Sequence, residues 1–123
     1  MRLFWGAACR GAPAVALVVF LSGAVALAQQ GLSTYEQITV GATAVGIATT
    51  TTNPTGRAQM NTCEVRVEAQ SVRFREDGTA PTASVGSPLD DNDTLTLPTN
   101  VRARAIRFIR SSGNAIVNVR CYP

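Results

Sequence analysis

A period of two in the placement of apolar residues decides which kind of fold this chain can adopt. In residues 63–68 (CEVRVE) every second side chain is apolar, and residues 115–121 (AIVNVRC) repeat the pattern. Because successive side chains of a strand point to opposite faces, both segments are predicted strands with one face in a core. The predicted inward positions are Cys63, Val65 and Val67 in the first segment and Val117, Val119 and Cys121 in the second.

Further short segments extend this pattern. Residues 72–75 (VRFR) and 94–97 (TLTL) alternate as well, and Asp-Gly at 77–78 is a strong turn signal after the first of them. Residues 79–88 contain two prolines and a Gly-Ser-Pro cluster, which predicts an irregular or edge segment. Residues 31–62 show no helical pattern of apolar residues, and we expect one or two edge strands and a long loop there.

Residues 101–110 (VRARAIRFIR) alternate in two phases. Arg102 and Arg104 have the same parity as Ile106 and Phe108, so a single regular strand would place both kinds of side chain on one face. A slip of one residue restores the order, and we therefore predict a strand with a bulge or corner near Ala105 and Ile106.

These segments add up to about six to eight short strands separated by turns, with no helix longer than one turn. This pattern is typical of an all-β protein, a small antiparallel β-sandwich or barrel. We expect one domain over residues 29–123, preceded by a hydrophobic N-terminal segment.

The N-terminal residues 1–28 have the pattern of an export signal. Two arginines and no acidic residue precede an uncharged run (AVALVVFLSGAVALA) that ends in Ala26-Leu27-Ala28. Small residues at the third and the last position before the cut, here Ala26 and Ala28, fit signal peptidase, which would cut after Ala28. The alternative is an uncleaved membrane anchor, because the uncharged stretch is close to the length that spans a bilayer. The predicted location is therefore exported: periplasmic, secreted or in the cell envelope.

Composition excludes several kinds of function. The chain has no His, and its 11 basic residues are all Arg. It therefore has no Ser-His-Asp or Cys-His pair, no His-ligated metal and no Schiff-base lysine. Two arginines lie in the first ten residues while all eight acidic residues come later, so the net charge of +3 belongs mostly to the N-terminal segment. The rest of the chain is nearly neutral, which argues against nucleic-acid binding because that binding depends on basic residues that contact phosphates.

Cys63 and Cys121 are the pair that can form a disulfide. Each lies on the predicted inward face of its strand, one at the start and the other at the end. If the two strands are antiparallel neighbours or face each other across a sandwich, both sulfurs point into the same interior. A disulfide is the expected outcome in an exported protein, and two buried free thiols are the alternative.

No catalytic, cofactor or metal site is predicted from the carboxylates. Asp90, Asp91 and Asp93 lack the spacing of a calcium loop, and a solvated turn explains them. Glu64 and Glu68 lie on the outer face of one strand and alternate with an arginine, which indicates surface charge pairing. We therefore predict no cofactor and a protein that is not an enzyme.

Four arginines form a possible partner-binding face. Arg73 and Arg75 lie on one predicted strand, and Arg107 and Arg110 lie on another. If these strands pair, several guanidinium groups share a face that could dock an acidic partner, because the planar guanidinium matches a carboxylate. The alternative is a solvated sheet face with cross-strand Arg–Glu pairs.

Residues 41–123 resemble small domains encoded among tailed-phage structural proteins. The most specific part is VRFR at 72–75 followed by DGTAPT at 77–82. The likeness also includes GATAVG at 41–46 and RAIRFIR at 104–110. The resemblance implies a compact β-sandwich that acts as a virion decoration or head-fibre component, and it brings no catalytic residues.

Three functions therefore stand as hypotheses. The first is a non-enzymatic exported module that binds a protein partner or assembles with itself, with a homo-oligomer as one form. The second is a virion decoration or head-fibre protein, although a virion protein needs neither an export signal nor a disulfide. The third is a small secreted hydrolase, for which the chain offers no nucleophile–base pair. A membrane contact is expected only through residues 1–28, if they are retained.

Overall fold

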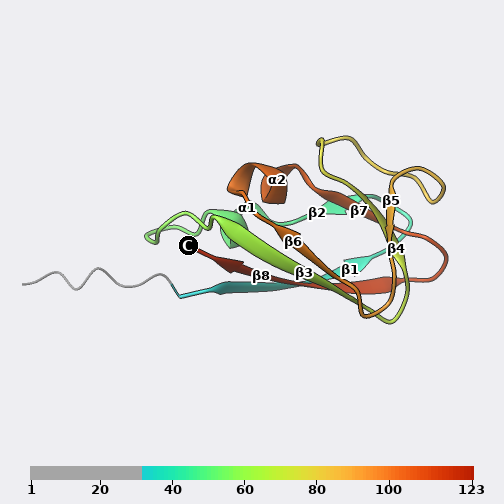
Figure 1. The fold of residues 1–123 in the computed structure, drawn as a ribbon, viewed down its shortest axis with the longest axis horizontal. Coiled ribbons are helices and arrows are strands. Elements are labelled where there is room, and N and C mark those ends of the chain that lie inside the picture. Colours follow the sequence, from blue (N-terminus) through green and yellow to red (C-terminus); the bar gives the residue numbers. More distant parts are fainter. Residues whose placement is uncertain (1–31) are drawn as a thin grey trace, which may run out of the picture.

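Two four-stranded antiparallel sheets make up the part of the chain that the computed structural model describes, residues 32–123 (Figure 1). Sheet A has the order β1-β8-β3-β6, with β1 (Thr34–Val40), β8 (Ala115–Tyr122), β3 (Thr62–Glu68) and β6 (Thr94–Leu97). Sheet B has the order β2-β7-β4-β5, with β2 (Val45–Gly46), β7 (Arg107–Arg110), β4 (Val72–Arg75) and β5 (Ser87–Leu89). The predicted all-β sandwich is confirmed.

Sheet A is organised around β3 and β8, its two central strands. They pair in antiparallel register, with Val65 opposite Val119 and Val67 opposite Val117. All six predicted inward residues of these strands are fully buried. The alternation in the sequence therefore identified the inner face correctly.

Sheet B closes the core from the other side. Val72 of β4 and Phe108 of β7 are fully buried and belong to the same apolar cluster as the inner residues of β3 and β8. The predicted edge strands are also present. Strands β1 and β2 are edges of the two sheets, and the irregular segment 79–88 leads into the edge strand β5.

The segment before β7 departs from the prediction. Residues Asn100–Ala105 form helix α2 where a strand was expected, and its six residues exceed one helical turn. The Thr99 side chain caps this helix by accepting from the Arg102 backbone N–H. Asn100 and Ala103 are the buried residues of α2, at a helical spacing of three that the alternation of Ala and Arg concealed. In place of the predicted bulge or corner near Ala105 and Ile106, the chain passes there from helix α2 to strand β7.

Helix α1 (Thr49–Thr52) and α2 lie together at one end of the sandwich (Figure 1). The buried Asn100 side chain joins them, because its Nδ2 donates to the carbonyl oxygens of Thr52 (2.9 Å) and Met60 (2.7 Å). On the other side of α1, the Glu36 carboxylate of β1 accepts from the Ala48 N–H and the Thr51 hydroxyl. Both helices are thereby fixed to the sheets.

Cys63 and Cys121 form the predicted disulfide. They lie directly opposite each other in the β3–β8 pair, with their Cα atoms 4.0 Å apart. The condition set by the sequence, that the two strands be antiparallel neighbours, is met. The bond is fully buried and joins residues 58 positions apart.

The predicted signal peptide or anchor, residues 1–28, lies outside the described residues. Within residues 32–123 neither helix has the length and apolar character needed to cross a membrane.

Reducing the disulfide should lower the free energy of unfolding by about 4 kcal/mol, since a loop of 58 residues is no longer closed in the unfolded state. Denaturant unfolding of the oxidised and reduced protein measures this difference. The double variant Cys63→Ala and Cys121→Ala should resemble the reduced protein. Equal midpoints for the oxidised and reduced forms would show that the bond contributes nothing.

Candidate functional site

Three of the four predicted partner-binding arginines share a face of sheet B. Strands β4 and β7 do pair, with Arg75 opposite Arg107 and Arg73 opposite Ile109. Arg110 lies opposite the buried Val72 and therefore has the parity of the inner face. The structure brings Arg73, Arg75 and Arg107 together on the outer face and separates Arg110 from them.

Most of these guanidinium groups bond within the chain. Arg73 donates from Nε to the Ala83 carbonyl (2.9 Å) and from Nη1 to the Gly86 carbonyl (2.8 Å), which holds the loop before β5. Arg75 forms an ion pair with Asp77 in the turn that follows β4. These contacts occupy the guanidinium groups of Arg73 and Arg75 within the fold, and none of them is a cross-strand Arg–Glu pair.

Arg110 also has an internal role. Its Nη1 donates to the Asn114 side-chain oxygen at 2.8 Å, within the turn that connects β7 to β8. Its guanidinium therefore stabilises a turn at the far end of β7.

Arg107 lies against the backbone of β2 and the end of α2. Its Nη1 donates to the carbonyl oxygens of Ile106 (2.8 Å) and Arg104 (3.0 Å), which lie at the C-terminal end of the helix. A Cβ at Gly46 would lie 2.5 Å from the same nitrogen, so any other residue there would require the guanidinium to move from this position. Because Gly46 has no side chain, the Arg107 guanidinium can lie against β2 and reach the two carbonyl oxygens.

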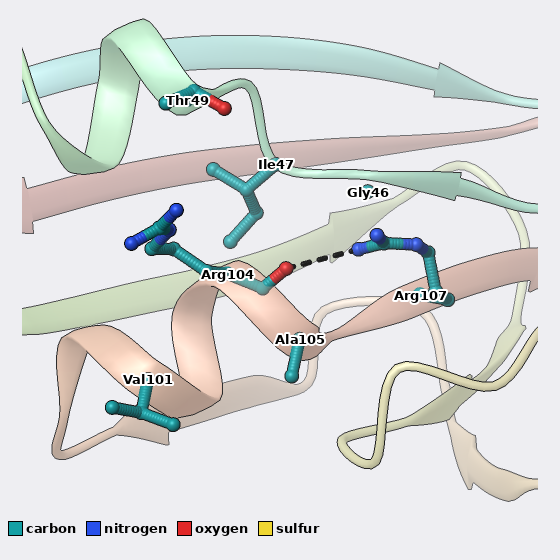
Figure 2. Close-up of a pocket in the computed structure, with 7 residues that line it drawn as sticks. All are labelled: Gly46, Ile47, Thr49, Val101, Arg104, Ala105 and Arg107. Carbon is teal, nitrogen blue, oxygen red and sulfur yellow. Dashed lines mark hydrogen bonds between the residues drawn. The ribbon is translucent and has the colours of Figure 1, made fainter.

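An open groove of about 600 Å³ lies where α1, β2, α2 and β7 meet (Figure 2). Figure 2 shows the Arg104 side chain extending toward α1 and the Arg107 side chain passing beside Gly46. The lining residues are Gly46, Ile47, Thr49, Val101, Arg104, Ala105 and Arg107. They include two guanidinium groups, one hydroxyl and no carboxylate.

The two arginines on the exposed side of α2 differ in their surroundings. Arg102 forms an ion pair with Glu76, whereas the Arg104 guanidinium makes no hydrogen bond or ion pair with any residue in the range 32–123. Val101, on the same helix, is 76% exposed and contributes an apolar patch to the groove wall. The groove therefore presents an available cation beside exposed apolar surface.

A second hollow of about 750 Å³ lies over β4 and β5. Its wall contains both members of the Arg75–Asp77 pair and both members of the Arg102–Glu76 pair. Since these opposite charges neutralise each other locally, this hollow offers less to a charged ligand than the groove beside Arg104.

The acidic residues at 90–93 form a turn, as the sequence predicts. The Asp90 N–H donates to the Asp93 carboxylate (3.0 Å), and Asp90 itself accepts from the Ser71 hydroxyl (2.9 Å). Within the part of the chain that the structure describes, no group of three or more His, Cys, Asp or Glu residues is arranged to hold a metal ion.

Arg104 was missed as a site residue because the sequence was interpreted as a strand at this point. Thr99 followed by Asn100 is an N-cap signal, and the apolar positions Ala103 and Ile106 continue at a spacing of three. This signal could have identified α2 and with it the exposed position of Arg104.

Replacing Arg107 by Gln should lower the free energy of unfolding by roughly 1–3 kcal/mol, because two backbone carbonyls lose a charged donor. Arg104→Gln is the matched control: it removes the same charge from the same groove and should leave the unfolding midpoint nearly unchanged. Thermal or denaturant unfolding measures both. Equal effects would mean that Arg107 contributes only its charge.

The pKa of Asp77 should lie below the usual value for Asp, because Arg75 donates a hydrogen bond to its carboxylate and the Thr79 N–H donates another. Because the pKa of Asp77 is lower in the folded state than in the unfolded state, the hydrogen bonds to its ionised carboxylate stabilise the fold fully at pH values above the unfolded pKa. This stabilisation is lost as the pH falls through the folded pKa.

An NMR titration of the Asp77 carboxyl measures this pKa directly. Arg75→Gln should raise it toward the ordinary value, and Arg66→Gln, on sheet A, should leave it unchanged. An ordinary pKa for Asp77 in the unaltered protein would contradict the ion pair.

Comparisons of the chain with protein-family models, with curated proteins and with solved structures give no match. The resemblance to tailed-phage virion domains thus stays a prediction. The candidate site depends on its own geometry, a cationic groove between two short helices and the edge of sheet B.

Proposed function

We propose that this chain is a non-enzymatic exported module that binds an acidic segment of a protein partner in the groove between α1, β2, α2 and β7. One observation carries the proposal: Arg104 and Arg107 line this groove and no carboxylate does. A carboxylate entering the groove meets the Arg104 guanidinium, which is free to donate two parallel hydrogen bonds to it.

The remaining groove surface fits a peptide better than a free ion. Exposed Val101 and the side chain of Ile47 supply apolar contact next to the cation, and Thr49 supplies a hydroxyl at the rim. A peptide with an acidic residue next to an apolar one could contact the guanidinium groups and the apolar side chains of the groove at the same time.

Two features support export. Residues 1–28 carry the charge and cleavage pattern of a signal peptide, and the core contains a disulfide, a bond that persists in oxidising compartments. The alternative function is a virion decoration or head-fibre protein. It is supported by the predicted resemblance and by the β-sandwich fold that the resemblance implies.

Binding is tested by calorimetric titration of the purified full chain with a peptide of four glutamates, and with a peptide of four glutamines for comparison. The glutamate peptide should bind and the glutamine peptide should not. Arg104→Gln should weaken binding by roughly tenfold or more, because a charge-assisted hydrogen bond is lost. Added salt should weaken it too.

Arg66→Gln is the control for net charge. Arg66 lies on the outer face of β3, away from the groove, and its replacement changes the net charge by the same amount. If Arg66→Gln weakened binding as much as Arg104→Gln, the attraction would be a property of the whole molecule and the groove would have no specific role.

Export is tested by the intact mass of the chain, taken without reduction from separated fractions of a bacterial host. A species that starts at Gln29 and is lighter by two hydrogens than the dithiol supports export. An uncleaved, reduced chain in the cytoplasmic fraction would overturn export and favour the virion alternative. Uncleaved protein in the membrane fraction would indicate an anchored module.

A further inference from the structure

Strand β1 is the longest edge of the sandwich. All seven of its residues, Thr34–Val40, pair with β8 on one side. Within residues 32–123, no backbone hydrogen bond joins β1 to any other segment, so the groups on its second side have no backbone partner there. Such an edge is a template for another strand.

The other three edges are short or interrupted. Strand β2 has two residues, β5 has three with Pro88 at its centre, and β6 has four and ends before Pro98. Short length and proline are the usual means by which proteins prevent edge pairing. Strand β1 has seven residues and contains neither proline nor lysine, the two residue types that commonly protect an edge strand from pairing.

The sequence of β1 is complementary to itself. In an antiparallel pair of two β1 strands with full overlap, Gln37 lies opposite its own copy and Tyr35 opposite Thr39. These outer-face side chains carry no charge, and Tyr35 is 61% exposed. Two copies related by a two-fold axis would therefore meet without like charges on this face.

Glu36, the charged residue of β1, does not prevent this pairing. It has the parity of the inner face, where it lies opposite Val119, and its carboxylate already accepts from the Ala48 N–H and the Thr51 hydroxyl. In the full-overlap register it faces Ile38 of the second copy, so the two carboxylates are not opposed. A shift that placed Glu36 opposite itself would oppose two like charges, which favours the register centred on Gln37.

We infer that two copies of this chain associate through their β1 strands and join the two A sheets into one continuous eight-stranded sheet. The inference rests on the proposed role as a non-enzymatic module and adds a second copy of the chain as its partner. The groove beside Arg104 is lined by residues of α1, β2, α2 and β7 and by no residue of β1, so the interface and the groove use different residues. Main-chain hydrogen bonds would provide the affinity, as in other cases of strand addition.

Introducing a charge at Gln37, the centre of the proposed interface, tests the pairing. Sedimentation equilibrium of the full chain should show a monomer–dimer equilibrium. Gln37→Lys and Gln37→Glu should each weaken the dimer by about tenfold or more, because each places like charges opposite each other. An equimolar mixture of the two variants should restore the dimer as a heterodimer, since opposite charges then meet.

Thr96→Lys is the matched control. Thr96 is exposed on the outer face of β6, at the opposite edge of the same sheet. A lysine there adds the same charge as Gln37→Lys but lies away from β1. It should leave the dimer unchanged. Circular dichroism and thermal unfolding of each variant establish that the monomer remains folded.

Two results would overturn the inference: a monomer at every concentration, or a dimer that Gln37→Lys weakens no more than Thr96→Lys does. The glutamate-peptide titration separates this inference from the proposed function. A variant that is monomeric yet binds the peptide supports pairing through β1 and an independent groove. A charge-sensitive dimer that does not bind the peptide supports the pairing and overturns only the groove function.

Discussion

The pairing of β3 with β8 is the interaction on which the rest of the structure depends. These two strands form the centre of sheet A, and each has a second neighbour, β6 for one and β1 for the other. Their inner faces supply a continuous row of buried valines, and the Cys63–Cys121 bond crosses between them. The buried residues of sheet B belong to the same apolar cluster as this row, so the two sheets share one core (Figure 1).

Arginine serves mainly as an internal connector in this protein. The guanidinium groups of Arg73 and Arg107 donate to backbone carbonyls of loops and of a helix end, where regular secondary structure leaves acceptors without partners. A planar group with five donors reaches two carbonyls at once, which a lysine does less well. Against this background, Arg104 stands out within the groove, because its guanidinium has no hydrogen-bond or ion-pair partner among residues 32–123 while that of Arg107 has two.

The sequence predicted the fold better than the site, for a physical reason. Strands with one buried face leave a period of two in the sequence, so β3, β4, β6 and β8 could be located and the Cys63–Cys121 bond inferred. Helix α2 leaves only a weak signal, the Thr99 N-cap and a spacing of three over little more than one turn, and its alternating Ala and Arg imitate a strand. The groove depends on α2 and on the close approach of Gly46 to Arg107, a contact between distant segments that no local pattern records.

The order of strands in sheet A has a consequence for the way the chain assembles during its synthesis. Strand β8 is made last among the described strands, yet it lies between β1 and β3, which are made early. Until β8 emerges, those two strands have no common neighbour, and β3 lacks the partner with which it forms its longest pairing. Sheet A as a whole can therefore form only after the last described strand has been made, which makes its assembly a late and long-range step.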